Sequence, residues 1–360
     1  MKKTLLFAAA TAALHGGVLA QTPAPSAVSI YGIVDLALRH TTNDGATAAT
    51  RGDSQSQVTA GMSQSRLGLN ISEDLGGGLR ALGNLEHRFN ADEGSSASST
   101  DFWRQSWVGL QGGFGRITVG RQYNVLFDVF TSTYASFRYS PYIEAFKPEI
   151  GFSLGARNSN MVKYLVESGP WRAAVQASVS EGAATGGKSS GGYVRYASGG
   201  FAAGGAYLAL RDGAARKSEV VTLGGSYSSG PWSTSLGLAR NKFESGFNPL
   251  IIASLLGNGG TNGTFALGNV EHRDMLSVGA GYQLTPQLNL GAHYWHARQT
   301  GRTTAGDGKA DFYAVVADYA FSKRTDVYLE IDRTRFRDSL TFANGATSRV
   351  GTMVGVRHRF

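Results

Sequence analysis

The charged side chains that are best placed to act together in this 360-residue chain are arginines standing at runs of alternating apolar residues. Arg66, Arg104, Arg121 and Arg157 each lie within such a run or at its end. A guanidinium group is planar, permanently charged and able to bind a carboxylate or phosphate through two hydrogen bonds. Such groups attract, orient and release anions, and they neither make nor break a covalent bond.

Residues suited to covalent or metal chemistry are sparse by comparison. The chain has no Cys, which excludes a disulfide scaffold, a Cys-zinc site and thiol catalysis. Its seven histidines form no HExxH motif, and nothing specifies metal ligands. His272 follows Glu271, a pairing that is common in solvated loops. We therefore expect neither an enzyme, such as a protease or phospholipase, nor a bound cofactor.

The composition indicates a large, folded chain without long apolar helices. It contains 49 Gly and only 8 Pro, with 42% hydrophobic and 17% charged residues and a formal net charge of +8. The glycines have no collagen-like period, and the apolar content is too high for a disordered chain. The basic residues are dispersed rather than clustered, which argues against a nucleic-acid partner.

The N-terminus carries the one long apolar run. Met1-Lys2-Lys3 precedes an apolar stretch over residues 4–14, and small residues follow at 18–20. This order is typical of a cleaved secretory signal, and the stretch is too short for a spanning helix. We expect residues 1–20 to be a cleaved signal peptide and 21–360 to form the exported domain.

Beyond residue 27 the dominant hydrophobic period is two. Leu67, Leu69 and Ile71 alternate with polar residues and glycine, and the same pattern recurs over residues 220–227 and 275–284. Each such segment is about ten residues long, as a strand with one apolar face requires. A soluble β-sandwich gives the same alternation, so the lengths of the connections must decide between the two folds.

The connections between these segments alternate between short and long. The short ones lie at residues 75–79, 112–115, 168–170, 198–200, 228–231, 285–286 and 322–325. The long ones lie at residues 41–61, 90–100, 122–156, 181–189, 212–217, 243–271, 299–309 and 337–347. Seven short and eight long connections join sixteen strands. The sequence therefore predicts an all-β fold, a 16-stranded antiparallel transmembrane β-barrel with tight turns at one end and long loops at the other.

Aromatic residues mark the ends of the expected strands and the C-terminus. They are Trp103, Trp107, Trp171, Trp232, Tyr282, Tyr319, Phe321 and Phe360. Girdles of aromatic residues lie at both membrane interfaces of transmembrane barrels. A chain that carries a signal peptide, alternating strands and a terminal Phe is expected in the outer membrane of a Gram-negative cell.

Six segments, in order along the chain, resemble the trimeric general porins of Gram-negative bacteria, in particular those of β-proteobacteria. They are SVSIYGIVDLAL, SRLGLNISEDLGGGL, FWRQSWVGLQGGFGRITVGRQY, PEIG, ARNSNMVKY and VGVRHRF. The resemblance covers almost all of the chain after the signal peptide. It implies a homotrimer and a third loop, residues 122–156, that folds into the lumen and forms a constriction.

The same resemblance implies two sets of pore residues. The basic set on the barrel wall comprises Arg66, Arg104, Arg121 and Arg157. The acidic set on the third loop comprises Asp128, Glu144 and Glu149, of which Glu149 matches the family's carboxylate at the loop tip. For any one of these arginines, an exposed side chain that pairs with a local carboxylate is the alternative.

The alternation independently orients two of the arginines. Leu67 on the lipid face turns Arg66 inward, because an arginine facing lipid at midplane costs about 2–4 kcal/mol. Placing Trp103, Trp107 and Gly109 outward turns Arg104 and Ser106 inward, although Val108 and Leu110 then face inward as well.

We predict an outer-membrane porin, a water-filled channel for passive diffusion of small hydrophilic solutes and ions, with anion preference. The third loop offers only three carboxylates against Arg138 and Lys147, so the wall arginines should dominate the potential. Expected partners are small anions or organic acids, outer-membrane lipid and lipopolysaccharide. The alternative is a substrate-specific channel for a sugar or organic acid, because aromatic residues crowd the third loop. They are Phe127, Phe130, Tyr134, Phe137, Tyr139, Tyr142 and Phe146, which could instead pack the loop onto the wall.

Overall fold

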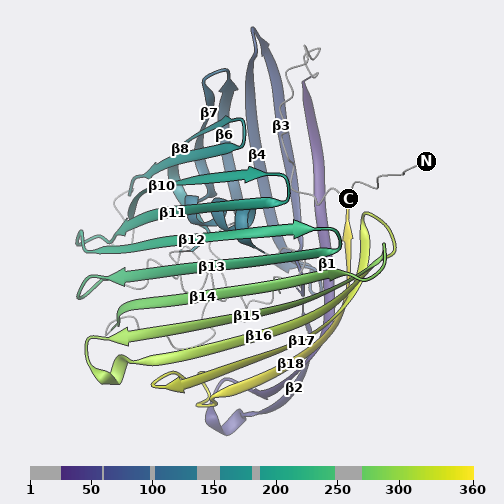
Figure 1. The fold of residues 1–360 in the computed structure, drawn as a ribbon, viewed down its shortest axis with the longest axis vertical. Coiled ribbons are helices and arrows are strands. Elements are labelled where there is room, and N and C mark those ends of the chain that lie inside the picture. The colour runs from purple at the N-terminus through teal and green to yellow at the C-terminus, as the bar shows by residue number, and fades with distance from the viewer. Residues whose placement is uncertain (1–25, 59–60, 98–101, 136–154, 181–186, 248–269) are drawn as a thin grey trace.

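The chain forms one closed antiparallel sheet that crosses between its two ends sixteen times (Figure 1). The computed structural model describes residues 26–58, 61–97, 102–135, 155–180, 187–247 and 270–360. Within these residues the sheet has 18 strand segments. The second crossing consists of β2 and β3 in succession, and β5 is a two-residue pairing with β4. The predicted 16-stranded antiparallel barrel is confirmed.

The strands are β1 (Ala27–Asp44), β2 (Gly52–Val58), β3 (Arg66–Gly76), β4 (Leu79–Asn90), β5 (Ser95–Ser96), β6 (Trp103–Gly112), β7 (Gly115–Tyr123), β8 (Arg157–Ser168), β9 (Trp171–Ser178), β10 (Lys188–Ser198), β11 (Phe201–Arg211), β12 (Lys217–Ser229), β13 (Trp232–Phe243), β14 (Val270–Gln283), β15 (Leu288–Gly301), β16 (Gly308–Ala320), β17 (Thr325–Asp338) and β18 (Ser348–Arg359). Short helical segments are the 3-10 turns η1 (Ala48–Thr50) and η5 (Thr304–Gly306), α1 (Val125–Val129) and the π-helical turn η2 (Phe130–Tyr134). None of the helices in the described residues is long and apolar enough to cross a membrane.

The barrel closes where the first strand meets the last. The pairing of β1 with β18 runs from Ile33 opposite Arg359 to Thr41 opposite Gly351, and it lies beside the C-terminus in Figure 1. The terminal Phe360 extends this ladder through two backbone hydrogen bonds with Gly32. Closure leaves no open strand edge, as a spanning sheet in lipid requires.

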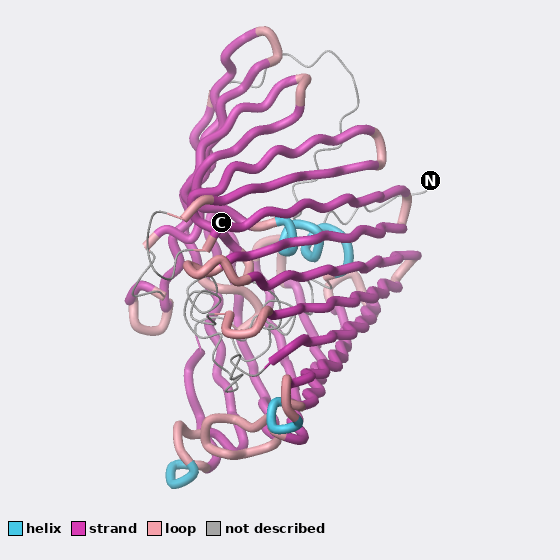
Figure 2. Tube along the Cα trace, turned by 90° about the vertical axis from the view of Figure 1, so that its left-hand side faces the viewer, coloured by secondary structure: helices cyan, strands magenta, loops and turns pink. Residues whose placement is uncertain are grey.

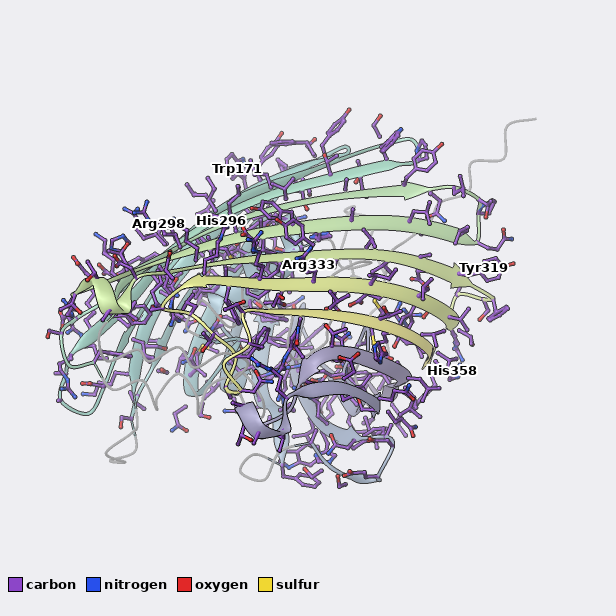
Figure 3. All side chains as sticks on the ribbon, turned by 90° about the horizontal axis from the view of Figure 1, so that it is seen from below. Trp171, His296, Arg298, Tyr319, Arg333 and His358 are labelled. Atoms are coloured by element: carbon purple, nitrogen blue, oxygen red, sulfur yellow. The ribbon has the colours of Figure 1, made fainter. Side chains whose placement is uncertain are left out.

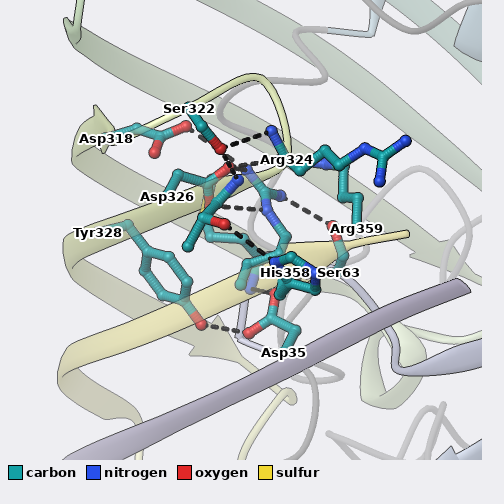
Figure 4. Close-up of polar contacts among 12 residues, drawn as sticks. Asp35, Ser63, Asp318, Ser322, Arg324, Asp326, Tyr328, His358 and Arg359 are labelled. Atoms are coloured by element: carbon teal, nitrogen blue, oxygen red, sulfur yellow. Dashed lines mark hydrogen bonds and ion pairs between the residues drawn. The ribbon is translucent and has the colours of Figure 1, made fainter.

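Side chains on the inner face reinforce this seam (Figure 4). Tyr328 of β17 donates from its hydroxyl to Asp35 of β1 at 2.5 Å. The other carboxylate oxygen of Asp35 accepts backbone N–H groups of Met62 and Ser63, which belong to the short segment between β2 and β3. Arg357 of β18 donates to Ser63 Oγ at 2.8 Å, so this segment is fastened to the wall from two sides.

The connections have the expected asymmetry, with one difference in the first loop. Seven tight turns join consecutive long strands, from Gly76–Leu79 to Ala320–Thr325. β1 continues to Asp44 and pairs there with β2, within residues 41–61 that the sequence reading treats as one loop. Polar sequence such as GDSQSQV hides this strand from a periodicity search, because no apolar face is needed above the membrane.

The two faces of the wall differ as alternation predicts. On β12, Val221 and Leu223 are exposed on the outside, whereas Thr222 between them is buried. The third loop begins inside the barrel with α1 and η2, which pack against β10, β11 and β12 (Figure 2). The inner wall thus presents polar side chains to a lumen that the third loop enters.

Candidate functional site

Arg66 and Glu86 face each other on neighbouring strands of the inner wall. Leu67 is 46% exposed on the outer face, which places Arg66 at the start of β3 on the inner one. Its Nη1 lies 3.6 Å from Oε2 of Glu86 on β4, and the Glu86 side chain is only 4% exposed. A carboxylate buried to this degree needs a cation close by.

Arg157 reaches the same carboxylate from β8. Its Nη2 lies 3.8 Å from Glu86 Oε1 and donates to the Tyr123 hydroxyl at 2.6 Å. The guanidinium group also stacks over the Tyr123 ring, 4.2 Å from its centroid. Tyr123 in turn stacks on Phe127 at 4.2 Å between centroids, so the first residues of the third loop help to hold Arg157.

Arg104 enters the cluster through a β-bulge. Glu86 pairs with Gln105 and His87 pairs with Trp103, which leaves Arg104 as the extra residue of β6. The side chain is 4% exposed and interacts electrostatically with Glu86, Arg88 and Arg157. Its Nε and Nη1 make no hydrogen bond within the described part of the chain.

The bulge corrects the expected orientation of β6. Val108 is 63% exposed and Leu110 44%, so these two residues, and not Trp107 and Gly109, face outward. Trp107 pairs with the inward Asn84, and Gly109 pairs with the buried Thr118. Trp107 is therefore not part of an outer aromatic girdle, and Ser106 does not share the inner face. Strict alternation fails here because the inserted residue of a bulge reverses the faces of the side chains on one side of it relative to those on the other side.

Arg121 lies at the margin of the group. It pairs with Ser106 and donates from Nη1 to Ser159 Oγ at 2.8 Å. It interacts electrostatically with Arg104, whereas Glu86 interacts with Arg66, Arg157 and Arg104. The structure thus brings Arg66, Arg104 and Arg157 together around one carboxylate. The expected place of Arg121 among them is corrected, because Arg121 pairs with the outward Ser106 and shares its face with Val119.

Three members of this cluster were missed by sequence reasoning: Glu86, Arg88 and Tyr31. Tyr31 donates from its hydroxyl to Glu86 Oε2 at 3.1 Å, and Asn84 donates to the same hydroxyl at 3.0 Å. The alternation of Asn84, Glu86 and Arg88 along β4 was the available signal, because these polar residues share the face opposite Leu85.

The acidic side of the expected waist is represented by Asp128 on α1. Its Oδ2 accepts a hydrogen bond from Lys163 Nζ at 2.7 Å, and Nζ also donates to the backbone oxygen of Tyr123 at 2.9 Å. The negative charge of Asp128 is therefore compensated by Lys163, a wall residue on β8. Glu144 and Glu149 lie outside the described residues, as do Arg138 and Lys147.

The start of the third loop is fixed to the wall opposite the arginines. The Tyr134 ring packs against Gly224 and Gly237, and its hydroxyl bonds with that of Thr222. Ser226 donates to the backbone oxygen of Thr133 at 2.5 Å. Phe130 and Tyr134 are thereby buried. These two aromatic residues pack the loop onto the wall, as one of the two interpretations of the loop aromatics expected. Phe137, Tyr139, Tyr142 and Phe146 fall outside the described residues.

Comparisons with known proteins agree with this architecture. The family model for Gram-negative porins matches residues 5–339. The outer membrane porin protein 32 of Delftia acidovorans is 29% identical over the full length of both chains. An outer membrane porin protein of Bordetella pertussis is 33% identical over 184 residues, which cover 47% of this chain and 45% of its own.

Solved structures show the same fold. The anion-selective porin from Comamonas acidovorans superposes with a TM-score of 0.75 at 26% identity, covering 93% of this chain and 100% of its own. The trimer form of OmpT from Vibrio cholerae, at 17% identity and a TM-score of 0.70, covers 94% of this chain and 100% of its own. With this wall, this inner loop and these relatives, the chain belongs to the Gram-negative porin family, whose members are non-enzymatic channels of the outer membrane.

Proposed function

We propose that this porin prefers anions and that Arg66, Arg104 and Arg157 form the basic side of its constriction. The observation that carries the proposal is the charge balance at Glu86, where Arg66, Arg104 and Arg157 all interact with one carboxylate. One negative charge cannot neutralise three permanent positive charges. The excess creates a positive potential, which a narrow pore with low-dielectric walls concentrates.

An ion that passes such a cluster must exchange its contacts from one arginine to the next and must not be bound tightly by any single arginine. An entering anion meets Arg66, whose side chain is 18% exposed, while the buried charge of Arg104 acts on the anion through its electric field. Tyr123 and Glu86 hold Arg157 in place, so its charge stays in position without a solute. Small inorganic anions and organic acids are the solutes that this chemistry favours. The anion-selective porin from Comamonas acidovorans is a relative with this preference.

The acidic side of the waist is proposed to consist of Asp128, Glu144 and Glu149 on the third loop. Asp128 already has its charge offset by Lys163. The remaining two carboxylates would face the arginine cluster and set up a field across the pore. With fewer free carboxylates than arginines, the net preference stays with anions.

A planar-bilayer measurement tests this proposal. The reversal potential of single channels under a salt gradient should have the sign of anion selectivity. In the double variant Arg66→Ala and Arg104→Ala, the anion-to-cation permeability ratio should fall towards one. The matched control, Arg211→Ala and Lys242→Ala, removes two positive charges from the outer face and should keep the wild-type ratio. A cation-selective wild type, or an unchanged ratio in the inner variant, contradicts the proposal.

We further propose that the protein is a homotrimer that contacts its neighbours through β1, β3 and β4. Exposed aromatic residues line the short-turn end of the barrel from the β6–β7 turn round to β18, and Figure 3 labels Trp171 and Tyr319 among them. Members of this belt are Phe114, Trp171, Phe201, Trp232, Tyr319, Phe321 and Phe360. In the described part of β1 and β3 the exposed residues at this end are aliphatic instead, namely Val28, Ile30, Ile71 and Leu75.

A sector without interfacial aromatics is suited to another protein surface rather than to lipid headgroups. Ile30→Arg should therefore shift the detergent-solubilised protein from the mass of a trimer to that of a monomer in light scattering. Leu223→Arg, on β12 across the barrel from β1 and 58% exposed against 65% for Ile30, should leave the trimer intact. Triplet conductance steps in the wild type would support the trimer, and single steps would oppose it.

Residues 1–20 are proposed to be a signal peptide that is removed on export, leaving residues 21–360 as the channel domain. This segment lies outside the described residues. N-terminal sequencing of protein purified from outer membranes should begin at Gln21. A sequence that begins at Met1 would refute the assignment.

A further inference from the structure

The outer face of β15, β16 and β17 carries an ordered grid of polar side chains at the long-loop end. The strand register aligns outward residues in three rows. From the loop end downward, the rows are Arg298–Lys309–Arg337, His296–Asp311–Arg335 and Tyr294–Tyr313–Arg333. Paired side chains in such rows have Cβ atoms about 5 Å apart, and rows are separated by about 7 Å.

This grid lies at the boundary of the lipid-facing band. The next row toward the short turns is Ala292–Val315–Ile331, where Val315 and Ile331 are large exposed apolar residues. Tyr294 and Tyr313 form an aromatic pair just above it, with ring centroids 5.0 Å apart. Tyrosine rings of this kind mark the headgroup level of a membrane, so the charges directly above them are level with lipid headgroups.

A single buried carboxylate organises the centre of the grid. Asp311 is 4% exposed and accepts the Tyr294 hydroxyl at 2.8 Å. His296 Nδ1 lies 2.7 Å from the same oxygen, and the Arg337 guanidinium group bonds to the other. Asp311 therefore holds three side chains in place and has little capacity left to neutralise further cations.

Three arginines of the grid have no such partner. Within the residues that the structure describes, no carboxylate lies within 4.0 Å of the guanidinium nitrogens of Arg298, Arg333 or Arg335, and all three are exposed. Figure 3 shows Arg298, with His296 beside it, projecting from the outside of the sheet. The outer-face cations Lys217 and Arg240, by contrast, each contact a carboxylate, Glu219 and Asp274 respectively.

We propose that this outer basic patch, defined as Arg298, Lys309, Arg333, Arg335 and Arg337, binds the phosphorylated sugar headgroup of an anionic glycolipid in the outer leaflet. Guanidinium groups donate paired hydrogen bonds to phosphate, and the spacing of the rows lets several of them act on one large headgroup. The tyrosine pair and the apolar row below give the acyl chains a matching surface. The site is independent of the pore and of its ion preference.

The test uses the full barrel, purified in detergent and stripped of lipid, with bisphosphorylated lipid A as the probe. Native mass spectrometry counts lipid bound to the wild type and to the variant Arg298→Gln, Arg333→Gln and Arg335→Gln. We expect the triple variant to bind on the order of a hundredfold more weakly, because three headgroup-pairing charges are lost. Single-channel conductance should stay unchanged, which shows that the variant is folded.

The control variant Arg211→Gln, Lys217→Gln and Lys242→Gln removes the same charge from the outer face of β11, β12 and β13. It should bind lipid A as the wild type does, and lipid A without its phosphates should bind weakly to all three proteins. If both variants lost lipid A binding equally, general charge attraction would explain the binding without this patch, and the proposal would be overturned. Displacement of lipid A by millimolar inorganic phosphate would also overturn it, because the site would then be one for free anions.

Discussion

The ring of Tyr134 occupies the space above Gly224, where an added Cβ would come within 2.2 Å of the ring. Gly237 on the next strand is similarly close, with 2.8 Å to the other edge of the ring. Two glycines on the inner wall thus form a slot for one residue of the third loop. Because the loop enters the lumen from this point, the slot positions the segment that is proposed to narrow the pore.

Gly224→Ala is expected to push Tyr134 out of its slot and shift the third loop. Overpacking of this kind costs about 1–3 kcal/mol of the free energy of unfolding. Single-channel recordings should show an altered conductance with more frequent closures, and Tyr134→Ala in the same chain should restore steady openings. Gly83→Ala is the control, because its Cβ would meet neighbours only at 3.4 Å or more. Wild-type conductance in Gly224→Ala would show that the slot does not set the position of the loop.

Glu86→Gln is expected to raise anion preference and to weaken the barrel. The substitution removes the carboxylate that Arg66, Arg104 and Arg157 share, so the positive potential of the wall increases. Breaking buried ion pairs from one side costs about 3–5 kcal/mol. Reversal potentials and urea unfolding measure the two effects, and a fall in anion preference would contradict the proposed role of the cluster.

Lys163→Gln is expected to lower anion preference. Without Nζ, the Asp128 carboxylate loses its partner at 2.7 Å and becomes an uncompensated negative charge at the start of the third loop. Lys163→Arg keeps the charge and should stay close to the wild type. The permeability ratio from reversal potentials distinguishes the two variants, and equal ratios would mean that Asp128 does not face permeating ions.

Asp332→Asn is expected to destabilise the seam of the barrel. Arg39 of β1 donates to both carboxylate oxygens of Asp332 on β17, at 2.6 and 3.0 Å, and both side chains are buried. The loss should amount to about 3–5 kcal/mol in the free energy of unfolding, measured by urea titration in detergent.

The control for the seam is the more exposed pair Arg172 and Glu167, which also has a short contact, 2.5 Å. Glu167→Gln should cost less than about 1 kcal/mol, because water screens an exposed pair. Similar losses in Asp332→Asn and Glu167→Gln would show that burial of the seam pair adds nothing to its strength.

Alternation in the sequence predicted the architecture and the sidedness of regular strands. Leu67 and its neighbours of the same parity face outward, as a spanning sheet requires, and Arg66 therefore lies inside. The same reasoning was wrong for β6, where the bulge at Arg104 reverses the sides of Trp107 and Val108. A bulge depends on the partner strand, and a period counted along one strand does not contain that information.

Hydrophobic alternation and the lengths of the connections are sufficient to predict sixteen membrane crossings with short turns at one end, because every crossing needs an apolar face and every turn needs polar residues or glycine. Which polar residues meet inside the barrel depends on the folded wall. Arg39 and Asp332 are 293 positions apart, and Glu86 joins arginines from three other strands. Such contacts follow from the closure and stagger of the whole barrel, to which every strand contributes. The excess of positive charge is visible in the composition, but its division between an inner cluster at Glu86 and an outer patch around Asp311 exists only in the folded wall.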